Sequence, residues 1–144
     1  MKALSIHPLY AMQIFFLEKT VENRTWKTNY RGDILICSTV KRYKDTIPGH
    51  ALCVVTLKDV VPMKKEHLEA AQMFEEEYNP DSYAWILENV RIIKPFEVKG
   101  KLSLWECDHD IEYIDGVDVS EEENERIFNE YYEPLMYHGD KEEW

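Results

Sequence analysis

Residues 18–26 read Glu-Lys-Thr-Val-Glu-Asn-Arg-Thr-Trp and form the densest polar stretch of the chain. Alternating residue types predict a strand over 20–25, on which Thr20, Glu22 and Arg24 share one face. Neighbours on that face lie about 6.5 Å apart, so a carboxylate and a guanidinium point into the same space. Lys19 stands where the preceding helix should end. This cluster is a candidate binding site; the alternative is an exposed strand edge with a weak ion pair.

Outward from this stretch, the sequence alternates between strand and helix patterns. Pro8 suits the first turn of a helix that should run to about Glu18. A second helix is expected over 64–77, where apolar residues recur at helical spacing. Further strands are expected over 3–6, 33–39, 51–61, 84–93 and 102–107, with a short hairpin or edge strand over 111–119. This order predicts an α+β fold, a small curved β-barrel with flanking helices.

The C-terminal segment carries a helix signal of its own. Ser120 and Glu123 have the spacing of a capping box, and acidic residues fill the first helical turn after Ser120. An apolar stripe follows at Ile127, Phe128, Tyr131 and Leu135. Such a helix is marginal alone in water, so we expect it to pack on the barrel or on a second copy. We divide the chain into a domain over 1–107 and an acidic extension over 108–144.

Charge is distributed unevenly along the chain. The net charge is −11, but residues 1–107 carry +1 and residues 108–144 carry −12. The acidic extension either keeps the protein soluble or competes with an anionic ligand for the basic N-terminal third. The second interpretation requires the C-terminal helix to lie beside Lys19 and Arg24. Removing residues 120–144 should then raise affinity for nucleic acid at low salt.

Composition and motifs exclude several classes of protein. The chain is 44% hydrophobic and 31% charged, as expected of a folded domain, and it has no apolar run long enough to span a membrane. It shows no signal peptide, and its three distant cysteines fit a reducing compartment, so we expect a cytoplasmic protein. Cys107 and His109 form an isolated pair rather than a zinc motif. We expect no metal and no cofactor.

Several stretches together resemble the ASCH domain of the PUA-like superfamily. They are Leu4-Ser5-Ile6-His7-Pro8, the Lys19-Thr20-Val21-Glu22-Asn23-Arg24 block that matches the family's K-x-x-E-x-R core, Tyr30-Arg31-Gly32, the strand over 51–61, Tyr83-Ala84-Trp85-Ile86-Leu87, and 95–102. The resemblance covers about residues 1–107. It implies a six-stranded barrel-like fold, a cleft lined by the Lys, Glu and Arg of the motif, and RNA binding. Glu18 replaces the family's usual Gly and adds an anion beside the cleft.

The resemblance leaves function classes open. A binding module would hold RNA or a modified nucleoside with Lys19, Thr20, Glu22 and Arg24, while Trp26 or Trp85 stacks on a base. A hydrolase, acting on a modified nucleoside or on RNA, would use Lys19 and Glu22 as an acid–base pair. Relatives that resemble acylated-cytidine amidohydrolases carry a Thr nucleophile where this chain has Glu22, and a carboxylate is no such hydroxyl. An adaptor would bind a protein partner, or itself, through the acidic helix.

Overall fold

The computed structural model describes residues 1–114, 120–139 and 142–143. Its main sheet has six strands in the order β2-β6-β5-β3-β1-β7. Strands β1 and β3 are parallel, and the other neighbouring pairs are antiparallel. The strands are β1 (Lys2–Ile6), β2 (Val21–Arg24), β3 (Gly32–Ser38), β5 (His50–Pro62), β6 (Tyr83–Glu97) and β7 (Leu104–Glu106). A separate pair joins β4 (Arg42–Tyr43) to β8 (Glu142–Glu143).

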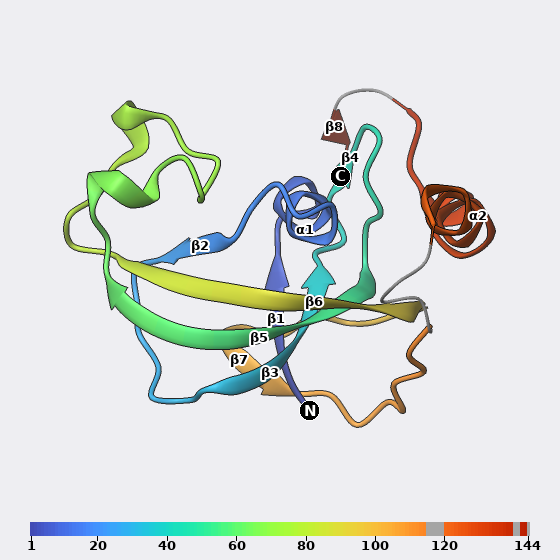
Figure 1. Cartoon of the computed structure of the whole chain (residues 1–144), viewed down its shortest axis with the longest axis horizontal. Helices are drawn as coiled ribbons and strands as arrows, with labels where there is room; N and C mark the ends of the chain where they lie inside the picture. Colours follow the sequence, from blue (N-terminus) through green and yellow to red (C-terminus); the bar gives the residue numbers. More distant parts are fainter. Residues whose placement is uncertain (115–119, 140–141, 144) are drawn as a thin grey trace.

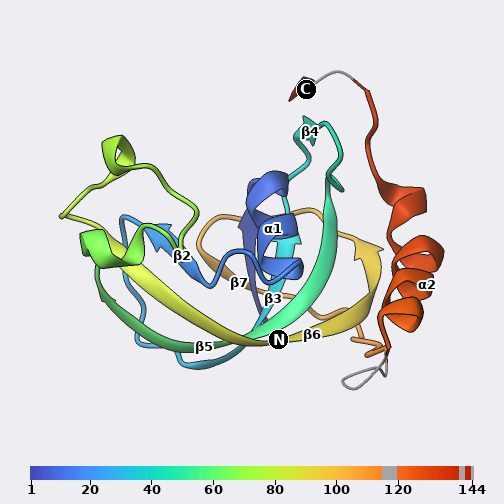
Figure 2. The same cartoon turned by 45° about the horizontal axis from the view of Figure 1, so that its top comes forward.

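The sheet curls into a half-barrel around helix α1 (Pro8–Phe15). Strands β5 and β6 are the long curved elements, and their register shifts between residues 51 and 59. Such irregularities bend a strand and increase its twist. Helix α1 lies over the concave face, and helix α2 (Glu121–Tyr131) lies at one flank (Figures 1 and 2). The predicted α+β architecture, a small curved barrel with flanking and C-terminal helices, is confirmed.

Local chemistry fixes both ends of α1. His7 caps the helix because its Nδ1 accepts a hydrogen bond from the Leu9 amide, and Pro8 occupies the first turn. Leu17 has a φ of 65° and ends the helical path. The helix therefore stops before Glu18, and the chain turns directly into Lys19 and β2. Its apolar face enters the main core, which also contains Leu4, Ile36, Leu52 and Trp85.

The helix predicted over 64–77 is wrong. The structure has only two short 3₁₀ turns there, η1 (Lys65–His67) and η2 (Glu75–Glu77). Between them, the Ala70 carbonyl accepts hydrogen bonds from the amides of Thr20 and Val21, and the Ala71 carbonyl accepts one from the Lys19 ammonium. These carbonyls pair with β2 and its flank rather than with a helical turn. Tertiary pairing therefore overrides a sequence with good helix propensity.

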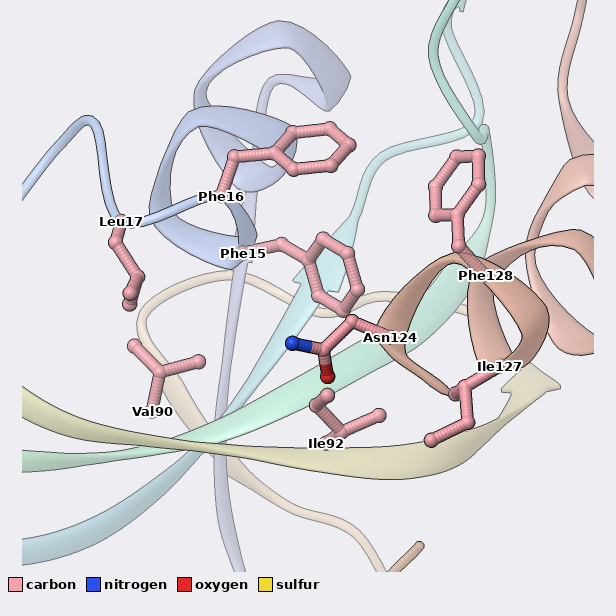
Figure 3. Close-up of a pocket in the computed structure, with 8 residues that line it drawn as sticks. All are labelled: Phe15, Phe16, Leu17, Val90, Ile92, Asn124, Ile127 and Phe128. Carbon is pink, nitrogen blue, oxygen red and sulfur yellow. The ribbon is translucent and has the colours of Figure 1, made fainter. Parts of the chain in front are cut away.

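Helix α2 begins as the sequence predicts, because the Ser120 hydroxyl accepts a hydrogen bond from the Glu123 amide. Ile127 and Tyr132 belong to the same core cluster as α1. The 3₁₀ turn η3 (Glu133–Leu135) follows and contains Pro134. An apolar cavity of about 280 Å³ lies between the two helices and β6 (Figure 3), lined by Phe15, Phe16, Leu17, Val90, Ile92, Asn124, Ile127 and Phe128.

The position of α2 contradicts the expectation that this helix competes at the Lys19–Arg24 edge. Both views place α2 on the opposite side of α1 from β2 (Figures 1 and 2). The apolar stripe was the dominant signal, and it directs the helix to Phe15 and Phe16, away from the basic residues. The strand expected over 111–119 is present only as an isolated bridge at Tyr113, and residues 115–119 lie outside the described residues. Within the described ranges, no helix is both long enough and apolar enough to cross a membrane.

Candidate functional site

A polar cavity of about 400 Å³ opens between β2, the N-terminal half of α1 and the segment that joins β5 to β6. The end of β1 and the residue after β3 complete its wall. This volume lies within the range of about 300–1,000 Å³ that small-molecule sites occupy. The lining residues are Ser5, Ile6, His7, Tyr10, Lys19, Glu22, Asn23, Arg24, Thr39, Met73 and Glu77.

A chain of three charges, two of them buried, forms one wall of this cavity. The Lys19 Nζ lies 3.5 Å from Glu22 Oε1, and Arg24 Nη2 lies 3.1 Å from Glu22 Oε2. The side chains of Lys19 and Glu22 are only 3% and 6% exposed, whereas that of Arg24 is 25% exposed. The structure thus brings together the three charged residues of the motif. The Glu22 carboxylate bridges the two cations.

Backbone contacts hold both cations in place. Lys19 donates a hydrogen bond to the Ala71 carbonyl at 2.5 Å, and Arg24 donates one to the Ser5 carbonyl at 3.2 Å. The Arg24 Nε is buried without a hydrogen-bond partner among the described residues. A buried donor that the protein does not satisfy is a group that an ordered water or a ligand oxygen completes. The wall is therefore rigid, and its bonding capacity is not exhausted.

Burial also changes the acidity of the site. Burial lowers the pKa of the Lys19 ammonium, although the nearby Glu22 carboxylate opposes this shift. Burial raises the pKa of the Tyr10 hydroxyl, and the charges of Glu77 and Glu22 add to the effect. The Lys19 ammonium also lies 5.1 Å from the centre of the Tyr10 ring. Perturbed groups that converge on a cavity are typical of functional sites.

The cavity is electrically balanced. Its wall carries two cations, Lys19 and Arg24, and two carboxylates, Glu22 and Glu77. Its aromatic members are Tyr10 and His7, whose rings lie 5.3 Å apart. The cavity therefore offers hydrogen-bond donors, acceptors and flat surfaces to a ligand without strongly favouring either sign of charge.

The structure does not bring the two predicted tryptophans to the cavity. Trp85 is fully buried in the core, and its indole N–H donates a hydrogen bond to the Trp26 carbonyl. Trp26 packs edge-on against it, with ring centres 4.7 Å apart. The prediction that either forms the cavity wall is therefore wrong, because their faces are used in packing. Thr20 lies just before β2 and is exposed. It does not line the cavity, so only Glu22 and Arg24 of the predicted strand face do so.

Several lining residues were not among the predicted site residues. The Lys19 ammonium lies over the Tyr10 ring, and the His7 ring contacts that of Tyr10. The quoted stretch from Leu4 to Pro8 contains His7, whereas no sequence signal pointed to Tyr10 as a site residue. Met73 and Glu77 come from the segment mistaken for a helix. In addition, the Glu77 carboxylate accepts a hydrogen bond from the Phe74 amide, which fixes this loop locally. No sequence pattern indicated that this loop reaches the motif.

A second cavity, of about 330 Å³, adjoins the first and shares Ser5, Arg24 and Thr39 with it. Its remaining lining residues are Leu4, Val40, Gly100, Lys101, Leu102 and Ser103. Among the residues that the structure describes, no group of three or more His, Cys, Asp and Glu side chains is placed to hold a metal ion.

Comparison with known proteins supports the family suggested by the motif. Residues 4–97 match the model of the ASCH domain. The chain is similar in fold to the crystal structure of ASCH from Zymomonas mobilis, with a TM-score of 0.57 and 18% identity over 89% of this chain and 93% of that chain. Two mutant structures of the Zymomonas mobilis protein give TM-scores of 0.54 and 0.57, at 19% and 17% identity, over 89% of this chain and 96% and 94% of theirs. No curated protein matches the chain significantly.

Proposed function

The chain belongs to the ASCH domain family and has its PUA-like fold, and we propose that its polar cavity binds a nucleobase, either in a nucleoside or in RNA. The observation that carries this proposal is the Lys19–Glu22–Arg24 cluster in the cavity wall, in which Lys19 and Glu22 are buried and Arg24 is partly buried. Burying the Lys19–Glu22 ion pair is costly, and such pairs seldom stabilise a fold more than apolar residues would. A ligand that uses their donors and acceptors gives the cluster a role.

The chemistry of the cavity favours a base over a simple anion. A base presents a neutral edge of donors and acceptors, and the balanced wall suits that edge better than it suits an isolated phosphate. The Glu22 carboxylate can accept a hydrogen bond from an exocyclic amine, while Arg24 can donate to a ring nitrogen or a carbonyl oxygen. Tyr10 and His7 supply the aromatic surface that the tryptophans do not.

We also propose that the protein acts in the cytoplasm. Its cysteines, Cys37, Cys53 and Cys107, are free thiols, which suits a reducing compartment.

Arg24→Ala should weaken ligand binding by about 1–3 kcal/mol, because the variant loses a charged contact to the ligand. The measurement is calorimetric titration with the four ribonucleosides, an acylated cytidine and a labelled single-stranded RNA. The matched control is Arg126→Ala, which removes an exposed arginine of α2 that pairs with Glu123 and Glu130 far from the cavity. Unchanged affinity in Arg24→Ala would move the site elsewhere.

A hydrolase is the second candidate, and the lowered pKa of Lys19 favours it. A lysine that loses its proton more readily than usual can serve as a general base, with Glu22 as its partner. Turnover of an acylated cytidine or of RNA should then rise with pH as Lys19 deprotonates, and Lys19→Met should abolish it. Binding without turnover across the pH range would leave the binding module as the function.

A further inference from the structure

We propose that the second cavity is a phosphate subsite, so that the complete site takes a phosphorylated nucleoside or a ribonucleotide strand rather than a free base. This inference rests on the proposed function of the first cavity. The two cavities share Ser5, Arg24 and Thr39, and one ligand can therefore occupy both. The distinction between them lies in their charge.

The second cavity is cationic where the first is balanced. Its wall carries Lys101 and also Arg24, which pairs with Glu22 of the first cavity, and none of its described lining residues is a carboxylate. Three hydroxyl side chains, those of Ser5, Thr39 and Ser103, belong to the same wall. Cations and hydroxyl donors without a competing acid are the groups that bind phosphate oxygens. The chemical class that fits this wall is a phosphate monoester or diester.

Arg24 connects the two subsites. Its guanidinium is fixed from one side by Glu22 and from another by the Ser5 carbonyl, while its Nε has no partner among the described residues. Ser5 in turn accepts a hydrogen bond from the Trp105 indole, which fixes its hydroxyl group. The ribose of a nucleotide would then lie near Arg24, with its base toward Glu22 and its phosphate toward Lys101.

Residue 100 packs closely against β1 beside the second cavity. A Cβ added at Gly100 would meet the Ser5 Oγ at 2.5 Å, so the backbone at residue 100 approaches β1 closely. This approach places Lys101 at the cavity wall while its side chain stays exposed. An exposed lysine is inexpensive to replace, and a substitution there tests binding without disturbing the core.

The experiment titrates the wild-type chain with the four ribonucleosides, their 5′- and 3′-monophosphates and a short mixed-sequence ribo-oligonucleotide. We expect at least one phosphorylated form to bind about tenfold or more tightly than its nucleoside. Lys101→Ala should remove most of this gain and leave nucleoside affinity unchanged. Its matched control is Lys99→Ala, which removes an exposed lysine two residues away that is outside the lining set.

A second pair of variants tests the charge of the cavity at Ser103. Ser103 has a φ of 59°, a conformation that Asp and Asn tolerate better than most residues. Ser103→Asp adds a carboxylate to the wall and should lower affinity for the phosphorylated ligand at least tenfold, with a smaller loss at high salt. Ser103→Asn introduces a neutral side chain of the same shape as Asp, and this variant should bind the phosphorylated ligand nearly as tightly as the wild type does.

The outcomes separate the two proposals. Nucleosides that bind as tightly as their phosphates would overturn the phosphate subsite and leave the base site standing. If nothing in the panel binds, both proposals fall. Monophosphates that bind as tightly as the oligonucleotide would identify a mononucleotide ligand, whereas a clear gain for the oligonucleotide would identify an RNA strand; either result supports the subsite.

Discussion

Glu22→Leu should lower the free energy of unfolding by about 3–5 kcal/mol, because it removes the carboxylate that pairs with the buried Lys19 ammonium. The Lys19 side chain is 3% exposed, and its remaining hydrogen-bond acceptor is the Ala71 carbonyl. Arg24 is less affected, since its side chain reaches solvent. Urea denaturation of the two proteins measures the difference. The matched control is Glu88→Leu, whose carboxylate is half exposed and lies 3.9 Å from Lys58; it should cost about 1 kcal/mol or less.

The double variant Lys19→Met, Glu22→Leu tests whether the buried pair is needed for stability or for ligand binding. Replacing both members of a buried pair with apolar groups of similar size is often neutral or stabilising. We therefore expect the double variant to recover most of the stability lost in Glu22→Leu while binding no ligand. That result would show that the pair is kept for function. A loss in the double variant as large as the sum of the single losses would instead make the pair part of the folding core.

The fold could be predicted from the sequence where local patterns and tertiary contacts agree. The predicted strand over 51–61 lies within β5, and its largely apolar first half, residues 51–57, is buried in the middle of the sheet. Pro8 and Ser120 begin helices as helix-capping rules predict. These signals act within one or two turns of chain, so no knowledge of distant residues is needed.

The failures have a common physical cause, which is contact between segments far apart in sequence. The 64–77 segment has a helical composition, but its carbonyls bond to residues 19–21, some fifty positions earlier. Trp85 was expected at the cavity because aromatic rings stack on bases, but it lies on a core-facing position of β6. The charged motif was predictable because its three residues lie within six positions of one another. The other walls of the cavity come from three separate stretches, which are residues 5–10, Thr39 and residues 73–77.

Tyr132→Ala should destabilise the protein by about 3–5 kcal/mol, as expected when a large aromatic side chain is removed from a core. Tyr132 is fully buried, and its ring lies 4.5 Å from that of Phe15. Its hydroxyl lies 2.6 Å from the Ile93 carbonyl and 2.9 Å from that of Leu52, so it ties the C-terminal segment to both long strands. Tyr132→Phe keeps the ring and should cost about 1–3 kcal/mol through the hydrogen bond alone.

Because of these core contacts, we expect removal of the C-terminal segment to lower the stability of the fold. A chain ending before residue 120 lacks Ile127 and Tyr132, and both belong to the main core cluster. We expect that chain to unfold well below the urea concentration that unfolds the wild type, whereas Asn129→Ala, an exposed change on α2, should unfold with the wild type. If the truncated chain instead kept its stability and bound RNA more tightly at low salt, the acidic segment would be a separate competitor for the ligand. Because Tyr132 is buried, we expect truncation to destabilise the chain instead. Residues 120–135 then complete the fold, and their charged groups lie on its outer face.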